Sequence, residues 1–182
     1  MDKTVRTQID NIRSEDGDLQ NKAFTYILKV TDKPVDWAYE VWDEMVDGLK
    51  HKDNHVRAIT AQVLSNLAKS DPKNRMLKDF EKLLIVTKDE RFVTARHCMQ
   101  SLWKVGVAGK KQQKVYVDGL ERRFKECITE KNCTLIRYDI LQSFRNVYDA
   151  VKDEKIREKA LELIETEEDL KYRKKYATLW RK

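Results

Sequence analysis

Residues 53–72, "DNHVRAITAQVLSNLAKSDP", have the pattern of one complete helix with both ends marked. Asp53 and Asn54 suit the N-cap, because their side chains can accept hydrogen bonds from the first free backbone N–H groups. The run stops at "SDP", because a proline disfavours helical geometry in the residue before it. Between these ends, apolar residues recur on one helix face: Val56, Ile59, Val63 and Leu67. The stretch therefore predicts an amphipathic helix over residues 54–69.

The same pattern returns along the chain. "VRAITAQVL" at 56 aligns with "ARHCMQSLW" at 95, "IRYDILQSF" at 136 and "YRKKYATLW" at 172. Each segment has an arginine at its second position, and these are Arg57, Arg96, Arg137 and Arg173, separated by 39, 41 and 36 residues. A weaker copy, "LQNKAFTYI" at 19, has Gln20 in place of the arginine. A period of this length filled by two helices indicates an α-solenoid.

The composition agrees with an all-α fold. Charged residues make up 37% of the 182 residues, while 5 glycines and 2 prolines leave little turn material for a β-rich fold. We predict a single domain over residues 1–182, with five repeats at 1–32, 33–71, 72–108, 109–151 and 152–182. The first helices of the pairs are expected near 2–15, 34–50, 73–88, 110–129 and 153–166. The second helices are expected near 18–31, 54–69, 89–107, 133–151 and 168–181.

The segment "HKDNHVRAITAQVLSNLAKSDP" resembles the HEAT repeats, an armadillo-like α-solenoid family. The resemblance lies in an acidic loop residue, a Val-Arg pair and a small residue four positions after the arginine, here Asp53, Val56, Arg57 and Ala61. It extends over nearly all of the chain, although the other repeats keep only the arginine and the apolar phase. It implies a right-handed α-α superhelix of about five helix pairs.

The resemblance also implies that the acidic loop residue and the arginine tie successive repeats together. Transferred residue by residue, it pairs Asp53 with Arg57, Glu90 with Arg96, and Glu168 or Asp169 with Arg173. The repeat at 109–151 offers only Glu130 before Arg137.

The row of arginines has two interpretations. Four guanidinium groups along a concave surface would suit phosphates or carboxylates. The structural interpretation is favoured, because a repeating unit needs a repeating tie and buried arginines must be paired. By the same reasoning Trp103 and Phe144 are expected in the core, whereas Trp180, on a terminal helix with no following repeat, is expected to stay uncovered.

The positive charge is concentrated in the second half of the chain. Residues 1–91 have 16 Lys and Arg against 17 Asp and Glu, whereas residues 92–182 have 21 against 14, so the halves carry −1 and +7. This asymmetry favours an anionic partner, with nucleic acid first and an acidic protein surface second, unless the charge only keeps a capping helix solvated. The candidate binding residues are Arg96, Lys104, Arg137, Arg145, Arg173, Lys174, Lys175 and Trp180.

No catalytic or metal-binding constellation is found in the sequence. His51, His55 and His97 fall in two repeats, and the three cysteines, Cys98, Cys127 and Cys133, form no CxxC pair. The glycines of "KVGVAGKK" follow a predicted helix and more simply end it than cradle a phosphate. We therefore expect no metal, no cofactor and no assigned catalytic residue.

Cysteine use and hydropathy place the chain in the cytoplasm by expectation. An odd number of cysteines without an export signal suggests reduced thiols. No apolar run approaches the roughly 20 residues that a bilayer requires, so no membrane contact is expected. The sequence defines no oligomeric state.

In size and basicity the chain is similar to the HEAT-like alkylpurine DNA glycosylases. That resemblance implies tryptophans with a carboxylate four residues away on one helix. Here the residues four positions after the tryptophans include Val41, Val46 and Val107, so the motif is absent. Asp139 is the only substitute considered, and helical geometry turns it about 200° from Arg137.

The sequence thus predicts a non-catalytic binding or scaffold module that uses its concave face and basic C-terminal end. Another protein is the expected partner, and a DNA-binding protein related to the glycosylases is the alternative. A scaffold would show mixed apolar and polar residues on that face, whereas a DNA-binding protein would align its cations into one positive band.

Overall fold

The computed structural model describes residues 1–181, in which helices are the only regular secondary structure. The α-helices are α1 (Lys3–Asn11), α2 (Gly17–Val30), α3 (Ala38–Gly48), α4 (Asn54–Leu67), α5 (Met76–Val86), α6 (Phe92–Ser101), α7 (Trp103–Gly106), α8 (Lys110–Glu126), α9 (Cys133–Val151), α10 (Glu154–Glu165) and α11 (Leu170–Ala177). Short 3-10 helices follow three of them: η1 (Ala68–Ser70), η2 (Cys127–Thr129) and η3 (Thr178–Trp180). No described helix is long and apolar enough to cross a bilayer.

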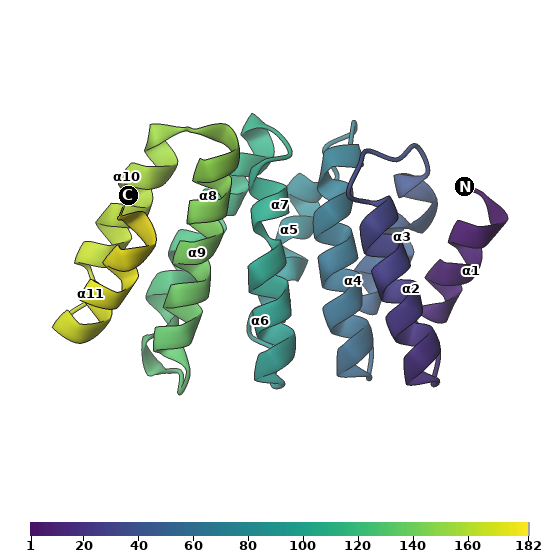
Figure 1. The fold of residues 1–182 in the computed structure, drawn as a ribbon, viewed down its shortest axis with the longest axis horizontal. Coiled ribbons are helices and arrows are strands. Elements are labelled where there is room, and N and C mark those ends of the chain that lie inside the picture. The colour runs from purple at the N-terminus through teal and green to yellow at the C-terminus, as the bar shows by residue number, and fades with distance from the viewer. Residues whose placement is uncertain (182) are drawn as a thin grey trace.

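The helices form two packed rows (Figure 1). The row nearer the viewer, here called row B, consists of α2, α4, α6, α9 and α11, and each of these packs on the next. Helices α3, α5 and α8 lie behind it, while α1 and α10 lie near the two ends. The chain therefore advances from one end of the molecule to the other as it alternates between the rows.

Aspartates cap the N-terminal ends of five of the described helices. Asp53 accepts a hydrogen bond from the backbone N–H of His55, and Asp2, Asp16, Asp153 and Asp169 cap α1, α2, α10 and α11 in the same way. Each cap satisfies N–H groups that have no partner within the helix. The predicted helix at 54–69 is confirmed as α4 followed by η1, and the one at 133–151 is confirmed as α9.

Several predicted helices have other bounds in the structure: the one at 2–15 ends at Asn11, and the one at 73–88 spans Met76–Val86. The helix expected from residue 34 starts at Ala38, and the backbone N–H of Val35 donates to Ser70 Oγ at the end of η1. The helix expected at 89–107 starts at Phe92 and divides into α6 and α7. Asp89 remains in the loop, where its carboxylate accepts hydrogen bonds from Arg57 and from the backbone N–H of Arg91.

The core between the rows is apolar, with a few polar groups that find partners. Trp42 is fully buried and donates from Nε1 to Asp79 Oδ2 at 2.9 Å, which joins α3 to α5. Phe144 is buried as predicted, while Trp103 is only partly buried. The expectation that Trp180 stays uncovered is wrong: it is 9% exposed, because η3 folds its ring against Tyr148 of α9, 5.7 Å between centroids.

Candidate binding surface

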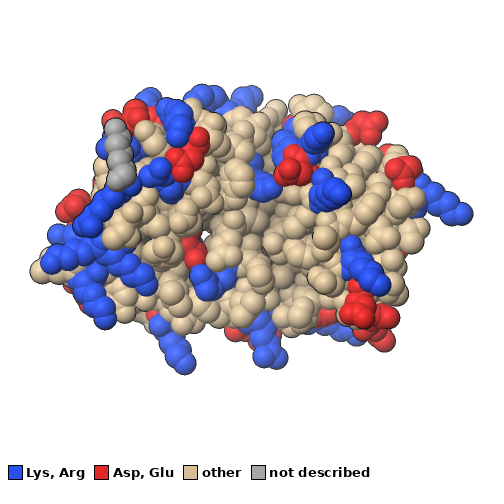
Figure 2. Space-filling model, viewed as in Figure 1, with Lys and Arg blue, Asp and Glu red and all other residues tan. Residues whose placement is uncertain are grey.

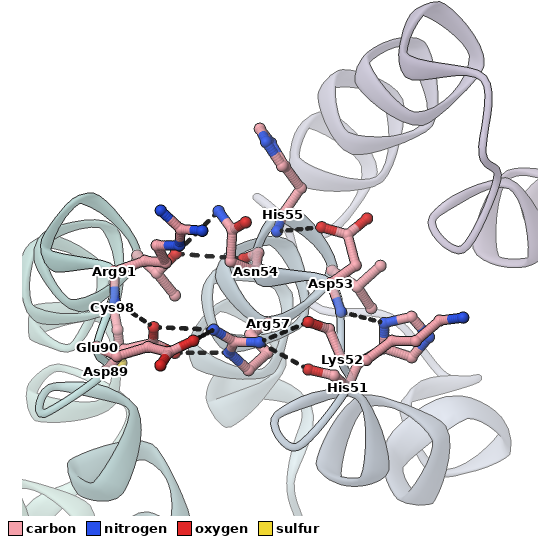
Figure 3. Close-up of polar contacts among 12 residues, drawn as sticks. His51, Lys52, Asp53, Asn54, His55, Arg57, Asp89, Glu90, Arg91 and Cys98 are labelled. Carbon is pink, nitrogen blue, oxygen red and sulfur yellow. Dashed lines mark hydrogen bonds and ion pairs between the residues drawn. The ribbon is translucent and has the colours of Figure 1, made fainter.

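Arg57 joins two successive helix pairs (Figure 3). It lies on α4, and its Nε and Nη2 donate to the two carboxylate oxygens of Asp89, at 2.6 and 2.9 Å, in the turn that precedes α6. Nη1 donates to the carbonyl oxygen of His51 at 2.8 Å. The guanidinium group is thus bonded on both sides, to its own repeat and to the next one.

The predicted carboxylate partners are wrong, although the arginines do connect repeats. Asp53 is occupied as the N-cap of α4, so Arg57 binds Asp89, with Glu90 4.0 Å away. Glu90 does not reach Arg96, which instead donates to both oxygens of Asp139 on α9, at 2.7 and 2.9 Å. The pairing runs forward to the following repeat, because the row B helices pack directly on each other.

The same forward pairing continues towards the C-terminus. Arg137 is 8% exposed and donates to Glu167 at 2.8 Å and to the carbonyl oxygen of Phe124 at 3.2 Å. The expected Glu130 instead binds Arg123. Arg173, in the last repeat, pairs within that repeat instead: it donates to the carbonyl oxygen of Glu167 at 2.7 Å, with Glu165 at 3.7 Å as its carboxylate rather than Glu168 or Asp169. These arginines are occupied by structural contacts.

The charged groups of these pairs have shifted pKa values. Burial acts to raise the pKa of Asp89, but the hydrogen bonds from Arg57 and from the backbone N–H of Arg91 prevail, and the pKa lies below its ordinary value. For Arg137, burial acts to lower the pKa and the hydrogen bond to Glu167 overcomes it. Asp89 and Arg137 therefore stay charged at neutral pH.

Asp139, considered as a glycosylase carboxylate, has no free oxygen for catalysis. Its side chain is 4% exposed, and both oxygens accept hydrogen bonds from Arg96. A general base must reach a substrate proton, which this carboxylate could do only after its ion pair opened.

Three of the remaining candidate cations, Arg145, Lys174 and Lys175, gather near the C-terminal end. Arg145 binds Asp149 and the carbonyl oxygen of Leu179, and its guanidinium carbon lies 5.7 Å from the Trp180 ring. Lys175 Nζ lies 5.3 Å from the ring of Tyr138, and Lys174 is exposed. Basic side chains cover the α11 end in Figure 2, whereas the middle of this face is mostly uncharged.

A depression of about 520 Å³ lies across the first three helices of row B. Its lining is mixed: Asn21 and Phe24 on α2, Ala58 and Ile59 on α4, and the exposed imidazoles of His55 and His97. Glu15 and Asp53, in the turns before α2 and α4, also line it. None of these residues is among the binding residues predicted from the sequence.

A second depression of about 260 Å³ continues towards the C-terminal ends of the same helices. It shares Gln62 with the first and is lined by Leu28, Asn66, Ser101 and Lys104. Lys104 Nζ also lies 5.2 Å from the Trp103 ring and 3.4 Å from Asp32. The two depressions, which share Gln62, lie along α2, α4 and α6 and are together called the row B groove here.

The repeat alignment contains a signal for this surface. The residues that directly follow the aligned second position are Asn21, Ala58, His97, Tyr138 and Lys174, and the first three line the groove. Seven positions further along lie Leu28, Ser65, Lys104, Arg145 and Arg181. Along row B, both series change from neutral to aromatic or basic. An alignment read for the residues in these two series, rather than for its arginines, could have indicated this gradient.

Neither family models nor curated protein sequences match the chain. Among solved structures, the crystal structure of an engineered protein from the Northeast Structural Genomics Consortium aligns with a TM-score of 0.52 and 14% sequence identity. The alignment covers 98% of this chain and 97% of that one. At this identity the likeness concerns the helical fold alone.

Proposed function

We propose that the chain is a non-catalytic binding module, a right-handed superhelix of five HEAT-like helix pairs that holds a segment of a partner protein across row B. The observation that carries the proposal is the row B groove, which combines apolar surface with amide and imidazole groups. Such a combination suits a peptide, because apolar contacts supply affinity and polar groups fix orientation.

The gradient along row B specifies the chemistry of the segment. A neutral and partly apolar stretch would fit the groove over α2, α4 and α6, while an acidic stretch would face Lys174 and Lys175 on α11. Five helices about 10 Å apart span about 40 Å, which is the length of about 12 extended residues. The expected ligand is therefore a segment of about that length with acidic residues at one end.

Selection from a displayed library of random peptides of about 12 residues tests this function. Peptides enriched on the wild-type chain should place Asp or Glu on one side of an apolar stretch. Their affinity should fall at least about tenfold with Asn21→Glu and His97→Glu combined, because two carboxylates would be placed beside the apolar groove. The matched control is Thr7→Glu with Ile85→Glu, which adds the same charge to exposed positions of α1 and α5.

Peptides that bind the groove variant and the control variant equally well would contradict the assignment of the groove. Failure to enrich any peptide over the bare support would contradict peptide binding itself. The wild-type chain and both variants are compared by circular dichroism first, so that a loss of affinity is not a loss of fold.

DNA binding is the second candidate, and the basic surface over α11 is the observation that favours it (Figure 2). Against it, Arg96, Arg137 and Arg145 are each bonded to a carboxylate and offer no free row of donors to phosphates. Three exposed lysines on α11 remain for such contacts: Lys171, Lys174 and Lys175.

A further inference from the structure

Two cysteine sulfurs lie together at the turn between α8 and α9. Cys127 Sγ and Cys133 Sγ are 2.6 Å apart, about half an ångström more than the roughly 2.05 Å of a disulfide bond. Cys127 belongs to η2 and is buried, whereas Cys133 is the first residue of α9 and is partly exposed. The third cysteine, Cys98, is fully buried on α6, where its thiol donates to the carbonyl oxygen of Leu83.

The surrounding contacts hold the turn in this shape. Arg123 binds Glu130 within the turn, at 2.6 and 2.8 Å, and also donates to the carbonyl oxygen of Thr87. The backbone N–H of Cys133 donates to the carbonyl oxygen of Glu130 at 3.0 Å. These bonds help to hold the two sulfurs close, which favours a reaction between them over reactions with other thiols.

The two thiols differ in their readiness to react. Burial, and next the hydrogen bond with Cys133, raise the pKa of Cys127 to about 12, although Arg137 and Arg123 act to lower it. Cys127 therefore stays protonated at neutral pH. Because thiolate character and access control the rate of oxidation, the partly exposed Cys133 is the thiol that meets an oxidant first.

We propose that Cys127 and Cys133 form a redox-active dithiol site that hydrogen peroxide converts into an intramolecular disulfide. The thiolate of Cys133 attacks one peroxide oxygen, the O–O bond breaks, and the departing hydroxide takes up a proton to become water. Cys127 Sγ then attacks the sulfur of the resulting Cys133 sulfenic acid. The S–O bond breaks, and the hydroxide that leaves takes the Cys127 proton as a second water.

Two thiols and one peroxide thus yield one disulfide and two waters, and a dithiol reductant restores both thiols. A reversible disulfide is compatible with a chain whose cysteines are otherwise reduced. The cross-link would fix the turn between α8 and α9. On these two helices, Arg123 binds Thr87 and Arg137 binds Glu167, and both partners lie in neighbouring repeats. Because the disulfide lowers the conformational entropy of the unfolded chain, the oxidised form should melt several degrees above the reduced form.

The test treats the full chain with hydrogen peroxide, blocks remaining thiols under denaturing conditions and measures intact mass. One disulfide removes two hydrogens and leaves Cys98 as the single blocked thiol. Trypsin cleaves after Lys131, so the disulfide should join the peptides of residues 126–131 and 132–137. Dithiothreitol should then restore three thiols.

Three variants make the outcome specific. Cys98→Ser should keep the peroxide-dependent mass change and the rise in melting temperature. Cys127→Ser should lose both and accumulate a sulfenic acid at Cys133 that dimedone traps. Cys127→Ala is the second variant at this position, in case serine disturbs the buried site. Three free thiols after peroxide treatment, a bridge to Cys98, or cross-linked dimers alone would each overturn the proposal.

Discussion

At the scale of single residues, the Asp89 carboxylate accepts two hydrogen bonds from Arg57, so its removal should lower the stability of the fold. The side chains of Arg57 and Asp89 are 13% and 6% exposed, so an unpaired charge would remain in a largely dry site. Asp89→Asn should lower the free energy of unfolding by about 2 kcal/mol in urea titrations at neutral pH. Glu81→Gln, in the exposed pair with Arg122, is the control and should cost less than about 1 kcal/mol. Equal losses in both variants would contradict a structural role for the Arg57 contact.

The same carboxylate predicts a dependence on pH. Its pKa in the folded chain lies below the unfolded value of about 3.9. The stability that it contributes is therefore complete above that value and is lost as the pH falls through the folded pKa. The difference in unfolding free energy between wild type and Asp89→Asn should be constant from pH 7 to 5 and should narrow below about pH 4. A difference that widens in acid would contradict the ionised pair.

At the scale of elements, Gly119 sets how closely α8 approaches α5. A Cβ at this position would lie 2.6 Å from Leu84 Cδ1 and 2.8 Å from Phe80 Cε1, and both of those side chains are buried. Alanine favours a helix over glycine by about 1 kcal/mol, but overpacking costs about 1 to 3 kcal/mol. Gly119→Ala should therefore destabilise the chain by up to about 2 kcal/mol, measured by urea unfolding.

Gly17→Ala is the matched control for that substitution. Gly17 is the first residue of α2, and no heavy atom lies within 4 Å of a Cβ added there. The alanine variant should be as stable as wild type or gain up to about 1 kcal/mol. If Gly119→Ala gained as much, the close packing of α5 and α8 would be refuted.

The helices could be predicted from the sequence because their signals are local. Caps such as Asp53 and the apolar period depend on neighbouring residues, and α4 follows from both of them. The helix α9 follows from the return of the same apolar pattern. The partners of Arg57 and Arg96 depend on how one helix pair meets the next. Two acidic residues, Asp89 and Glu90, stand side by side in the sequence, and only packing decides which one the arginine reaches.

The candidate sites were harder to predict for the same reason. The row B groove is formed between helices of three repeats, so its residues lie about 37 to 39 positions apart and share no local motif. The spacing of Cys127 and Cys133 was visible in the sequence, but not that the turn brings their sulfurs to 2.6 Å. The sequence does show which residues occupy the same position in successive repeats, such as Asn21, Ala58 and His97 in the groove.

At the scale of the whole molecule, DNA binding would depend on the positive charge near the C-terminal end. The exposed lysines on α11 allow about three phosphate contacts, for which the logarithm of affinity should fall with a slope of about −2.7 against the logarithm of salt concentration. A duplex of about 20 base pairs should therefore bind weakly, and about 40-fold more weakly after a fourfold rise in salt. Fluorescence anisotropy measures both quantities.

Charge reversal locates that binding. Lys171, Lys174 and Lys175 changed together to Glu should abolish it, whereas the same change at Lys22, Lys33 and Lys50 should leave most of it. The two triple variants have equal net charge and alter only exposed positions, so a difference between them reports where the duplex lies. Equal losses would mean that the duplex responds to net charge alone. Three solvated lysines alone would not hold a duplex at physiological salt, because salt screens their charges. Binding that persists at this salt concentration and fails only in the α11 variant would therefore favour DNA over a peptide as the partner.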